Sequence, residues 1–286
     1  MAKIVGGLAT SHVPAIGKAM SEQKFQDPYW KSFFEGYEPA RAWLEKTKPD
    51  IAVVFYNDHG LNFFLDNLPT FAVGAAPEYG NADEGWGLPV VAPYPGDPAL
   101  SWRLIEDLVA EEFDVSTCQQ MKVDHAFWIP MALLWPGAQR PVRVIPIEIN
   151  TVQHPLPSAK RCFKLGQAVA RSIAGWDKDL KVVVMGTGGL SHQLEGERAG
   201  FINKEFDLQC LEDIVAHPEK LTGYSNFELV ELAGSQGVEL LMWLAMRAAM
   251  GPEAQVVTSS YHVPISNTAA GLLVLEPKAR AMAEAV

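Results

Sequence analysis

The sequence predicts an α/β protein, a single domain in which helices flank a mixed central sheet. Several short apolar runs end abruptly in small or polar residues, as strands buried inside a sheet do. Segments with helical character lie between these runs, so strands and helices alternate along the chain. The 286 residues, 48% of them hydrophobic and 20% charged, are enough to form one large core.

The expected strands are the apolar runs at residues 4–8, 51–56, 142–149, 182–185 and 272–275. The expected helices cover residues 37–46, 98–112, 158–173, 203–216, 226–232 and 234–250. Residues 77–98 are rich in Pro and Gly and show little periodicity, which indicates an ordered surface excursion rather than a domain boundary. We therefore expect one domain over residues 1–286, with a frayed helix or tail at 278–286.

Composition disfavours several classes of function. A formal net charge of −11 argues against nucleic acid, because phosphates attract clustered Lys and Arg. Cys118, Cys162 and Cys210 are too far apart for a Cys-x-x-Cys metal pair or an obvious disulfide framework, which favours a reducing cytoplasm. No apolar stretch reaches the length of a membrane span, and residues 4–9 are too short for a signal-peptide core.

Three of the seven histidines each follow a predicted strand by a few residues: His12, His59 and His192. Ligand sites of open α/β sheets collect at the carboxyl ends of strands, so these imidazoles are expected to converge on one site there. For any one of them alone, a structural role is favoured. Asp58 and Asp124 each precede a histidine, but neighbouring side chains of an extended segment point apart, so both aspartates can be structural.

Glu239 is a second candidate, because it lies in a segment whose other residues from Val238 to Met246 are all apolar. A helix of this composition is largely buried. An ionised carboxylate is costly there unless it pairs with a cation or binds a metal. The structural alternatives are a surface position or an ion pair with Arg247.

Two neutral imidazoles and one carboxylate form the donor set that non-haem Fe(II) oxygenases use, with coordination positions left for other ligands. A zinc hydrolase can use the same donors, so the ligand types leave zinc open. The sequence contains no His-Glu-x-x-His segment to support zinc.

The chain resembles the class III extradiol dioxygenases, the family of protocatechuate 4,5-dioxygenase β subunits and gallate dioxygenases, over nearly its whole length. The motifs that carry this resemblance are SHVP at 11–14, YNDH at 56–59, ADEGWG at 82–87, VDH at 123–125, KRCF at 160–163, GTGGLSHQL at 186–194, GVEL at 237–240 and YHVPISNT at 261–268.

The resemblance implies that His12, His59 and Glu239 bind Fe(II) and that His192 is the acid/base. An imidazole with a pKa near ~6.5 can accept a phenolic proton at neutral pH and return it later. It also implies that a carboxylated catechol, either protocatechuate or gallate, is opened beside the iron and that both atoms of O2 enter the product.

The resemblance further implies that His125 is a second active-site histidine and that Ser266 and Asn267 hold the substrate carboxylate. The remaining histidines, His154, His217 and His262, are left structural or unassigned. Residues 126–128, Ala-Phe-Trp, are bulkier than expected for the family and are expected to reshape one pocket wall.

Family enzymes of the protocatechuate type pair this kind of chain with a small helical α subunit, and we expect such a partner here, in a higher oligomer. Two other classes of function stay open. One is a metal-free binding or scaffolding protein with the same fold, because fold alone does not establish function. The other is a zinc-dependent hydrolase.

Overall fold

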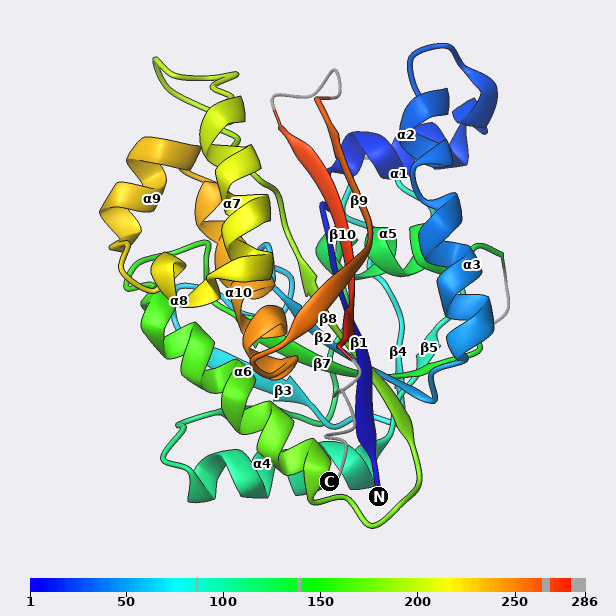
Figure 1. Cartoon of the computed structure of the whole chain (residues 1–286), viewed down its shortest axis with the longest axis vertical. Helices are drawn as coiled ribbons and strands as arrows, with labels where there is room; N and C mark the ends of the chain where they lie inside the picture. The colour runs from blue at the N-terminus through cyan, green and yellow to red at the C-terminus, as the bar shows by residue number, and fades with distance from the viewer. Residues whose placement is uncertain (86, 138–139, 264–267, 279–286) are drawn as a thin grey trace, which may run out of the picture.

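In the computed structural model, the chain forms a large mixed sheet covered on both faces by helices, which confirms the predicted fold class (Figure 1). The structure describes residues 1–85, 87–137, 140–263 and 268–278. The eight strands of the sheet lie in the order β6-β3-β7-β2-β8-β1-β10-β9. The four central strands, β7, β2, β8 and β1, are parallel to one another, and β10, β9 and β3 run antiparallel to their inner neighbours.

The strands of this sheet are β1 (Lys3–Thr10), β2 (Ile51–Tyr56), β3 (Phe71–Gly74), β6 (Ser116–Cys118), β7 (Arg143–Ile149), β8 (Lys181–Thr187), β9 (Ala254–His262) and β10 (Ala270–Pro277). A two-stranded ribbon, β4 (Glu78–Tyr79) with β5 (Tyr94–Pro95), lies within the predicted surface excursion. All five predicted strands are present, because each contains a short apolar run and most of its residues are buried.

The helices are α1 (Pro14–Ser21), α2 (Lys31–Glu35), α3 (Glu38–Thr47), α4 (Pro98–Ala110), α5 (His125–Leu134), α6 (Ala159–Ala174), α7 (Lys204–Ala216), α8 (Pro218–Leu221), α9 (Asn226–Ala233) and α10 (Leu240–Ala249), with 3-10 turns η1 (Lys24–Gln26) and η2 (Gly237–Glu239). Among the described residues, no single helix is long and apolar enough to cross a membrane, and α9 meets that test only together with residues 237–249, at a bend of 118°.

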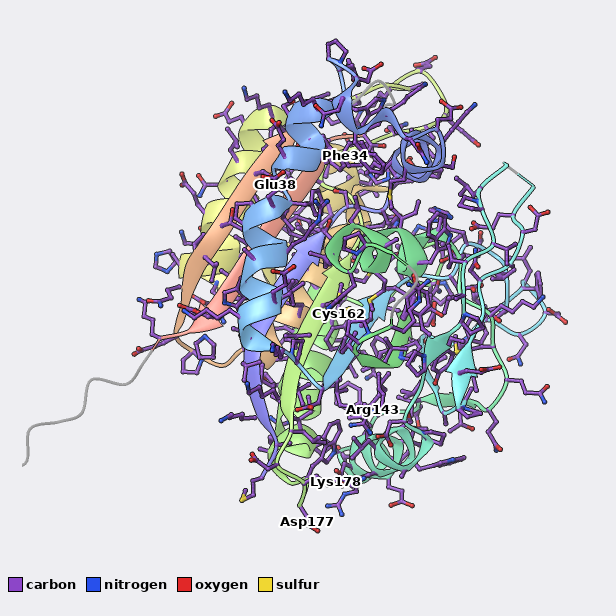
Figure 2. All side chains as sticks on the ribbon, turned by 90° about the vertical axis from the view of Figure 1, so that its right-hand side faces the viewer. Phe34, Glu38, Arg143, Cys162, Asp177 and Lys178 are labelled. Atoms are coloured by element: carbon purple, nitrogen blue, oxygen red, sulfur yellow. The ribbon has the colours of Figure 1, made fainter. Side chains whose placement is uncertain are left out.

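Alternate residues of each central strand supply the two halves of the core. In β2, Val53 and Phe55 pack with α4, α6 and α10, whereas Val54 and Tyr56 pack with α1, α3 and α5. Figure 2 looks onto the second of these layers, where Phe34 of α2 and Glu38 of α3 are labelled. Helices thus pack on both faces of the central strands, and the ends of these strands are left for a ligand site.

The predicted helix at 234–250 is shorter than expected. Gly234 has φ 88, a left-handed conformation that favours glycine, and it ends α9. The chain then forms the 3-10 turn η2 before α10 begins, so Glu239 lies at the entrance of the buried helix rather than inside it. The expectation of a buried helix is confirmed, because every residue of α10 is buried.

Two other expectations have plain outcomes. Cys118, Cys162 and Cys210 are all free, as their spacing predicted. The tail expected at 278–286 lies outside the described residues except for Lys278.

Candidate metal centre

The three histidines that follow strands meet at one edge of the sheet. His12 follows β1, His59 follows β2 and His192 follows β8, and these strands are neighbours in the order β2-β8-β1. Because the three strands are parallel, their carboxyl ends lie at the same edge. All three histidines and Glu239 line one cavity of about 650 Å³. The convergence expected from the sequence is therefore observed.

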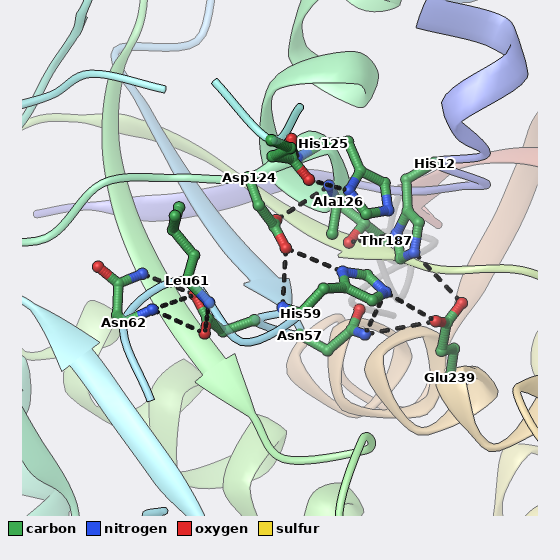
Figure 3. A network of polar contacts seen from close by, with 12 residues as sticks. His12, Asn57, His59, Leu61, Asn62, Asp124, His125, Ala126, Thr187 and Glu239 are labelled. Carbon is green, nitrogen blue, oxygen red and sulfur yellow. Dashed lines mark hydrogen bonds and ion pairs between the residues drawn. The ribbon is translucent and has the colours of Figure 1, made fainter. Parts of the chain in front are cut away.

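Two imidazoles and one carboxylate lie close enough to bind one metal ion. The Nε2 of His12 is 3.3 Å from Oε2 of Glu239, and the Nε2 of His59 is 3.6 Å from Oε1 of the same carboxylate (Figure 3). The His12 and His59 rings lie edge to face, with centroids 5.3 Å apart. The side chain of Glu239 is 4% exposed.

The structure brings Glu239 to this point through two glycines of the loop after β8. The backbone N of Gly189 donates to Oε2 of Glu239 at 2.8 Å. Gly188 has φ 125, and a Cβ atom there would lie 2.7 Å from Cβ of Glu239. A larger residue at 188 would displace the carboxylate, so Gly188 is needed for the close approach of this loop to η2.

The carboxylate of Glu239 is held in its charged form by the histidines around it. Burial opposes ionisation, but His12 and His192 together lower the pKa of Glu239 well below its usual range. The structural alternative, an ion pair with Arg247, is wrong, because that guanidinium donates to the backbone carbonyls of residues 215, 251 and 252. The described residues thus provide Glu239 with imidazoles and with N–H donors, the surroundings of a metal-binding carboxylate.

Asp124 orients His59. Its Oδ2 accepts from the backbone N of His59 at 2.9 Å and from the ring Nδ1 at 2.8 Å, which leaves Nε2 directed towards Glu239. Burial lowers the pKa of His59, but the carboxylates of Asp124 and Glu239 outweigh it and raise that pKa to about 10. These carboxylates therefore stabilise a positive charge at this position, the charge that a bound cation supplies.

His12 is held in a similar way by a hydroxyl. Its Nδ1 lies 3.3 Å from Oγ1 of Thr187, the last residue of β8, which leaves Nε2 for the carboxylate. Asn57 adds a further contact, because its Nδ2 donates to Oε1 of Glu239 at 3.3 Å. Each of the three metal-binding candidates thus has a neighbour that fixes its orientation, as metal ligands in proteins usually do.

His192 lies beside this trio with its base nitrogen facing the same space. Its Nδ1 donates to the carbonyl oxygen of Leu190 at 3.1 Å, so the lone pair is on Nε2, which is 3.7 Å from Oε2 of Glu239. Burial lowers the pKa of His192, and His12 and His59 lower it further. A neutral imidazole at neutral pH is the form that can accept a proton.

His125, the first residue of α5, completes the group. Its ring stacks on that of His59, with centroids 4.2 Å apart and planes at 29°. Ring nitrogens of His12, His59 and His125 also lie within 4.8 Å of one another, which makes a second conceivable ligand set. We favour Glu239 over His125 as the third ligand, because the carboxylate of Glu239 contacts the Nε2 atoms of both His12 and His59.

The cavity has one largely apolar wall and a few polar groups. The lining includes Val152, His154 and Leu156, which follow β7, and also Leu194 and Gln236. His154, which the sequence left unassigned, thus reaches the cavity. His217 lies away from it and contacts Glu219 at 3.8 Å, and His262 packs against Phe33. Ser266 and Asn267, expected to hold a substrate carboxylate, lie outside the described residues.

The expected effect of residues 126–128 on the pocket wall is not observed among the described lining residues. Ala126, Phe127 and Trp128 are buried in the core between α5 and the sheet, and only His125 of this helix lines the cavity. Phe127 packs edge to face on Tyr56 instead. Their bulk therefore fills the core beneath the site.

Sequence reasoning missed the residues that hold the histidines and Glu239 in place: Asn57, Glu84, Asp124 as the partner of His59, Thr187, Gly188 and Gly189. The DEGWG segment and the two Asp-His pairs can be recognised in the sequence. No rule of residue spacing, however, predicts that Asp124 contacts His59 or that Glu84 contacts His125. Asp58, by contrast, is structural as suggested, because it accepts from the backbone N of residues 61, 62 and 63.

Comparison with known proteins identifies the family to which the chain is similar. Residues 6–272 match the family model described as "Catalytic LigB subunit of aromatic ring-opening dioxygenase". Gallate dioxygenase from Pseudomonas putida is 40% identical over 202 residues, which is 70% of this chain and 59% of that protein. The chain thus spans about three fifths of the gallate dioxygenase.

One further relative and one solved structure cover more of the chain. A 2,3-dihydroxyphenylpropionate/2,3-dihydroxicinnamic acid 1,2-dioxygenase from Rhodococcus is 28% identical over 92% of this chain and 95% of its own. The crystal structure of an uncharacterized protein from Escherichia coli K12 covers 94% of this chain and 99% of its own with a TM-score of 0.58, at 15% sequence identity. This last likeness concerns the fold alone.

Proposed function

Because the chain belongs to the family of catalytic LigB subunits of aromatic ring-opening dioxygenases, we propose that it cleaves a carboxylated catechol by the extradiol route with Fe(II). The observation that carries this proposal is the contact of one buried carboxylate, Glu239, with the Nε2 atoms of both His12 and His59. The substrates we favour are protocatechuate, with cleavage between carbons 4 and 5, and gallate.

The donor set fits Fe(II). Two imidazoles and one carboxylate on one side of a cavity leave positions open for other ligands, as in the non-haem Fe(II) oxygenases. When bound there, Fe(II) supplies the positive charge that favours a deprotonated catechol and the redox chemistry that activates O2. His12, His59 and Glu239 hold this ion, and Asp124 and Thr187 keep the two imidazoles in position.

His192 accepts a phenolic proton in this proposal. Its Nε2 carries a lone pair because Nδ1 donates to Leu190, and it faces the space next to Glu239. The proton can be returned from the same nitrogen later in the reaction, when ring opening requires an acid. Such a positioned acid/base typically contributes about 10²–10⁴-fold to the rate.

The pocket suits a small aromatic ring. A cavity of about 650 Å³ with apolar residues such as Val152, Leu156 and Leu194 in its walls can bury a single-ring substrate. The substrate carboxylate requires a polar partner, and we assign this role to Ser266 and Asn267 on the strength of the resemblance. The name of the relative that is 40% identical favours gallate as a substrate to be tested beside protocatechuate.

We also propose a separate small helical α subunit as a partner, in a higher oligomer. Two apolar side chains in the pocket wall, Val152 and Leu194, are 51% and 53% exposed. A partner that covers them would bury apolar surface and exclude water from the reacting groups. Size-exclusion chromatography after co-expression with a candidate α subunit measures this association.

The test is anaerobic reconstitution with Fe(II), with and without such an α subunit, followed by O2 uptake and product absorbance. The substrates are protocatechuate, gallate, 3-O-methylgallate and 2,3-dihydroxyphenylpropionate. We expect one O2 consumed per ring opened with at least one carboxylated catechol. Absence of uptake with all four, in protein that contains iron and has its partner, would contradict the proposed function.

Ligand assignment is tested separately by metal analysis. The variants His12→Ala and Glu239→Ala should bind little iron, whereas the surface variant His217→Ala should bind as much as the unmodified protein, because His217 lies away from the cavity. Iron content that is the same in all four proteins would refute the assignment. Hydrolysis of a substrate with zinc bound, without O2 uptake, would support the zinc alternative instead.

A further inference from the structure

Glu84 lies on the loop between β4 and β5, yet both of its carboxylate oxygens contact a single active-site histidine. Its Oε1 accepts from the backbone N of His125 at 2.8 Å, and its Oε2 lies 2.6 Å from the ring Nδ1. The side chains of the two residues are 9% and 3% exposed. A carboxylate supplied from 41 residues away thus fixes both the backbone and the ring of His125.

The contact repeats the one that Asp124 makes with His59. Asp124 also receives the backbone N and the Nδ1 of one histidine, at 2.9 and 2.8 Å. The two histidine rings stack at 4.2 Å, so the wall of the cavity contains two stacked imidazoles that are each held by one carboxylate in the same way. In His59 the contact with Asp124 directs Nε2 towards the metal-binding carboxylate. The contact of His125 with Glu84 has no role assigned so far.

The chemistry of the pair determines which ring nitrogen carries the proton. A carboxylate can only accept a hydrogen bond, so Nδ1 of His125 must donate to Glu84. In a neutral imidazole the lone pair is then on Nε2. The ring of His125 lies 5.4 Å from that of His12 and lines the same cavity, so this imidazole borders the space where substrate would bind.

The loop that carries Glu84 is braced at several points. Asn81 donates from Nδ2 to the carbonyl oxygen of residue 89 at 3.0 Å and accepts from the backbone N of Val91 at 2.8 Å. The backbone N of Ala82 donates to the carbonyl oxygen of Val123, next to α5, at 3.2 Å. Asp83 accepts from the backbone N of Gly85 at 2.9 Å. These contacts hold the carboxylate against the first turn of α5.

We propose that Glu84 is a positioning residue that sets the tautomer of His125, with the proton on Nδ1 and the lone pair of Nε2 facing a hydroxyl group of the bound catechol. His125 and His192 then provide one acceptor for each of the two hydroxyl groups. The catechol as ligand rests on the proposed function. The tautomer of His125, by contrast, is a property of the protein without substrate.

The variant Glu84→Gln tests this proposal with little change in shape. Its amide oxygen can still accept from the backbone N of His125, but its NH2 group must then donate to Nδ1, which moves the ring proton to Nε2. Nitrogen-15 NMR of labelled histidines distinguishes N–H from lone-pair nitrogens, and a His125→Asn variant assigns the signals. We expect the Nδ1–H tautomer in the unmodified protein without metal and the Nε2–H tautomer in Glu84→Gln.

The kinetic consequence is measured in protein reconstituted with Fe(II). We expect Glu84→Gln to keep its iron and to lose about 10- to 100-fold in kcat, the usual range for removal of a residue that orients an active-site group. Glu84→Asp keeps an acceptor-only group and should recover part of this loss. Asp83→Asn is the matched control, because it removes one charge from the same loop and leaves the contact with His125 intact.

Two outcomes would overturn the proposal: an Nε2–H tautomer of His125 in the unmodified protein, or the same tautomer in the unmodified protein and in Glu84→Gln. If the unmodified protein cleaves no catechol while its tautomer follows the expected change, the proposed function fails and the role of Glu84 stands. A loss of kcat in Glu84→Gln without a change of tautomer would assign Glu84 to loop structure only.

Discussion

The carboxylate of Asp124 holds His59, 65 residues away, rather than His125, which follows it in the chain. Its Oδ2 accepts from both the backbone N and the ring Nδ1 of His59. Glu84 in turn holds His125. The two Asp-His pairs of the sequence are therefore not hydrogen-bonded units, and the contact that matters for the metal centre crosses between two loops.

Replacement of Asp124 by Asn should weaken metal binding. The Asn side chain still caps α5, where Oδ1 accepts from the backbone N of Ala126, so the helix should form. The substitution removes the negative charge that keeps Nδ1 of His59 protonated. The affinity for the metal should therefore fall about 10- to 100-fold. Titration of the metal-free protein with Fe(II) or Zn(II) measures this. The exposed Asp66→Asn serves as control, and equal affinities for both variants would contradict the role of Asp124.

A Cβ atom at residue 188 should displace Glu239. We expect Gly188→Ala to bind little iron and to lose about 1–3 kcal/mol of unfolding free energy, because φ 125 is strained for any other residue. Gly196→Ala is the matched control: Gly196 has φ 78, but a Cβ atom there meets no atom closer than 3.8 Å. The Gly196→Ala variant should also have a strained backbone, but it should keep its iron. Metal analysis and urea unfolding separate the two effects, and iron retained by Gly188→Ala would argue against the close approach.

Removal of the His192 imidazole should remove most of the turnover without loss of the metal. His192→Ala leaves His12, His59 and Glu239 in place, so iron content and catechol binding should persist while kcat falls about 10²–10⁴-fold. Anaerobic titration with catechol, followed by oxygen uptake, measures binding and turnover separately. A variant with full activity would show that another group moves the proton.

Glu148, the sixth residue of β7, should make the protein less stable as the pH rises from 4. Burial raises the pKa of its carboxyl group well above the usual range, and Asp58 and Asp124 raise it further. The folded protein then binds a proton that the unfolded chain has released above its ordinary pKa, so the stability of the folded state falls with pH in that window. Glu148→Gln is neutral at every pH and removes this dependence.

We therefore expect Glu148→Gln to unfold at higher urea concentration than the unmodified protein at pH 7, and the difference to shrink towards pH 4. Urea unfolding at several pH values measures this. A difference that is constant with pH would show that Glu148 is ionised in the folded protein, or that the variant acts through packing.

Local apolar patterning was enough to find the central strands. The run Ile51–Tyr56 is fully buried on both faces, and its apolar letters mark both ends of β2. The same rule could not find β9, Ala254–His262, because this edge strand is half exposed and mixes Gln, Thr and Ser with its apolar residues. It also missed α5, whose residues are apolar on all sides and include Pro130.

The sequence by itself determined which groups can act: imidazoles that follow strands, and a carboxylate within an otherwise apolar helical segment. It could not determine which residues orient them, because Asp124 meets His59, and Glu84 meets His125, only after loops from distant parts of the chain pack at one sheet edge. Strand order decided that packing, since β2, β8 and β1 become neighbours although they are far apart in sequence. Residue types are local information, whereas hydrogen-bond partners depend on contacts that only the folded chain creates.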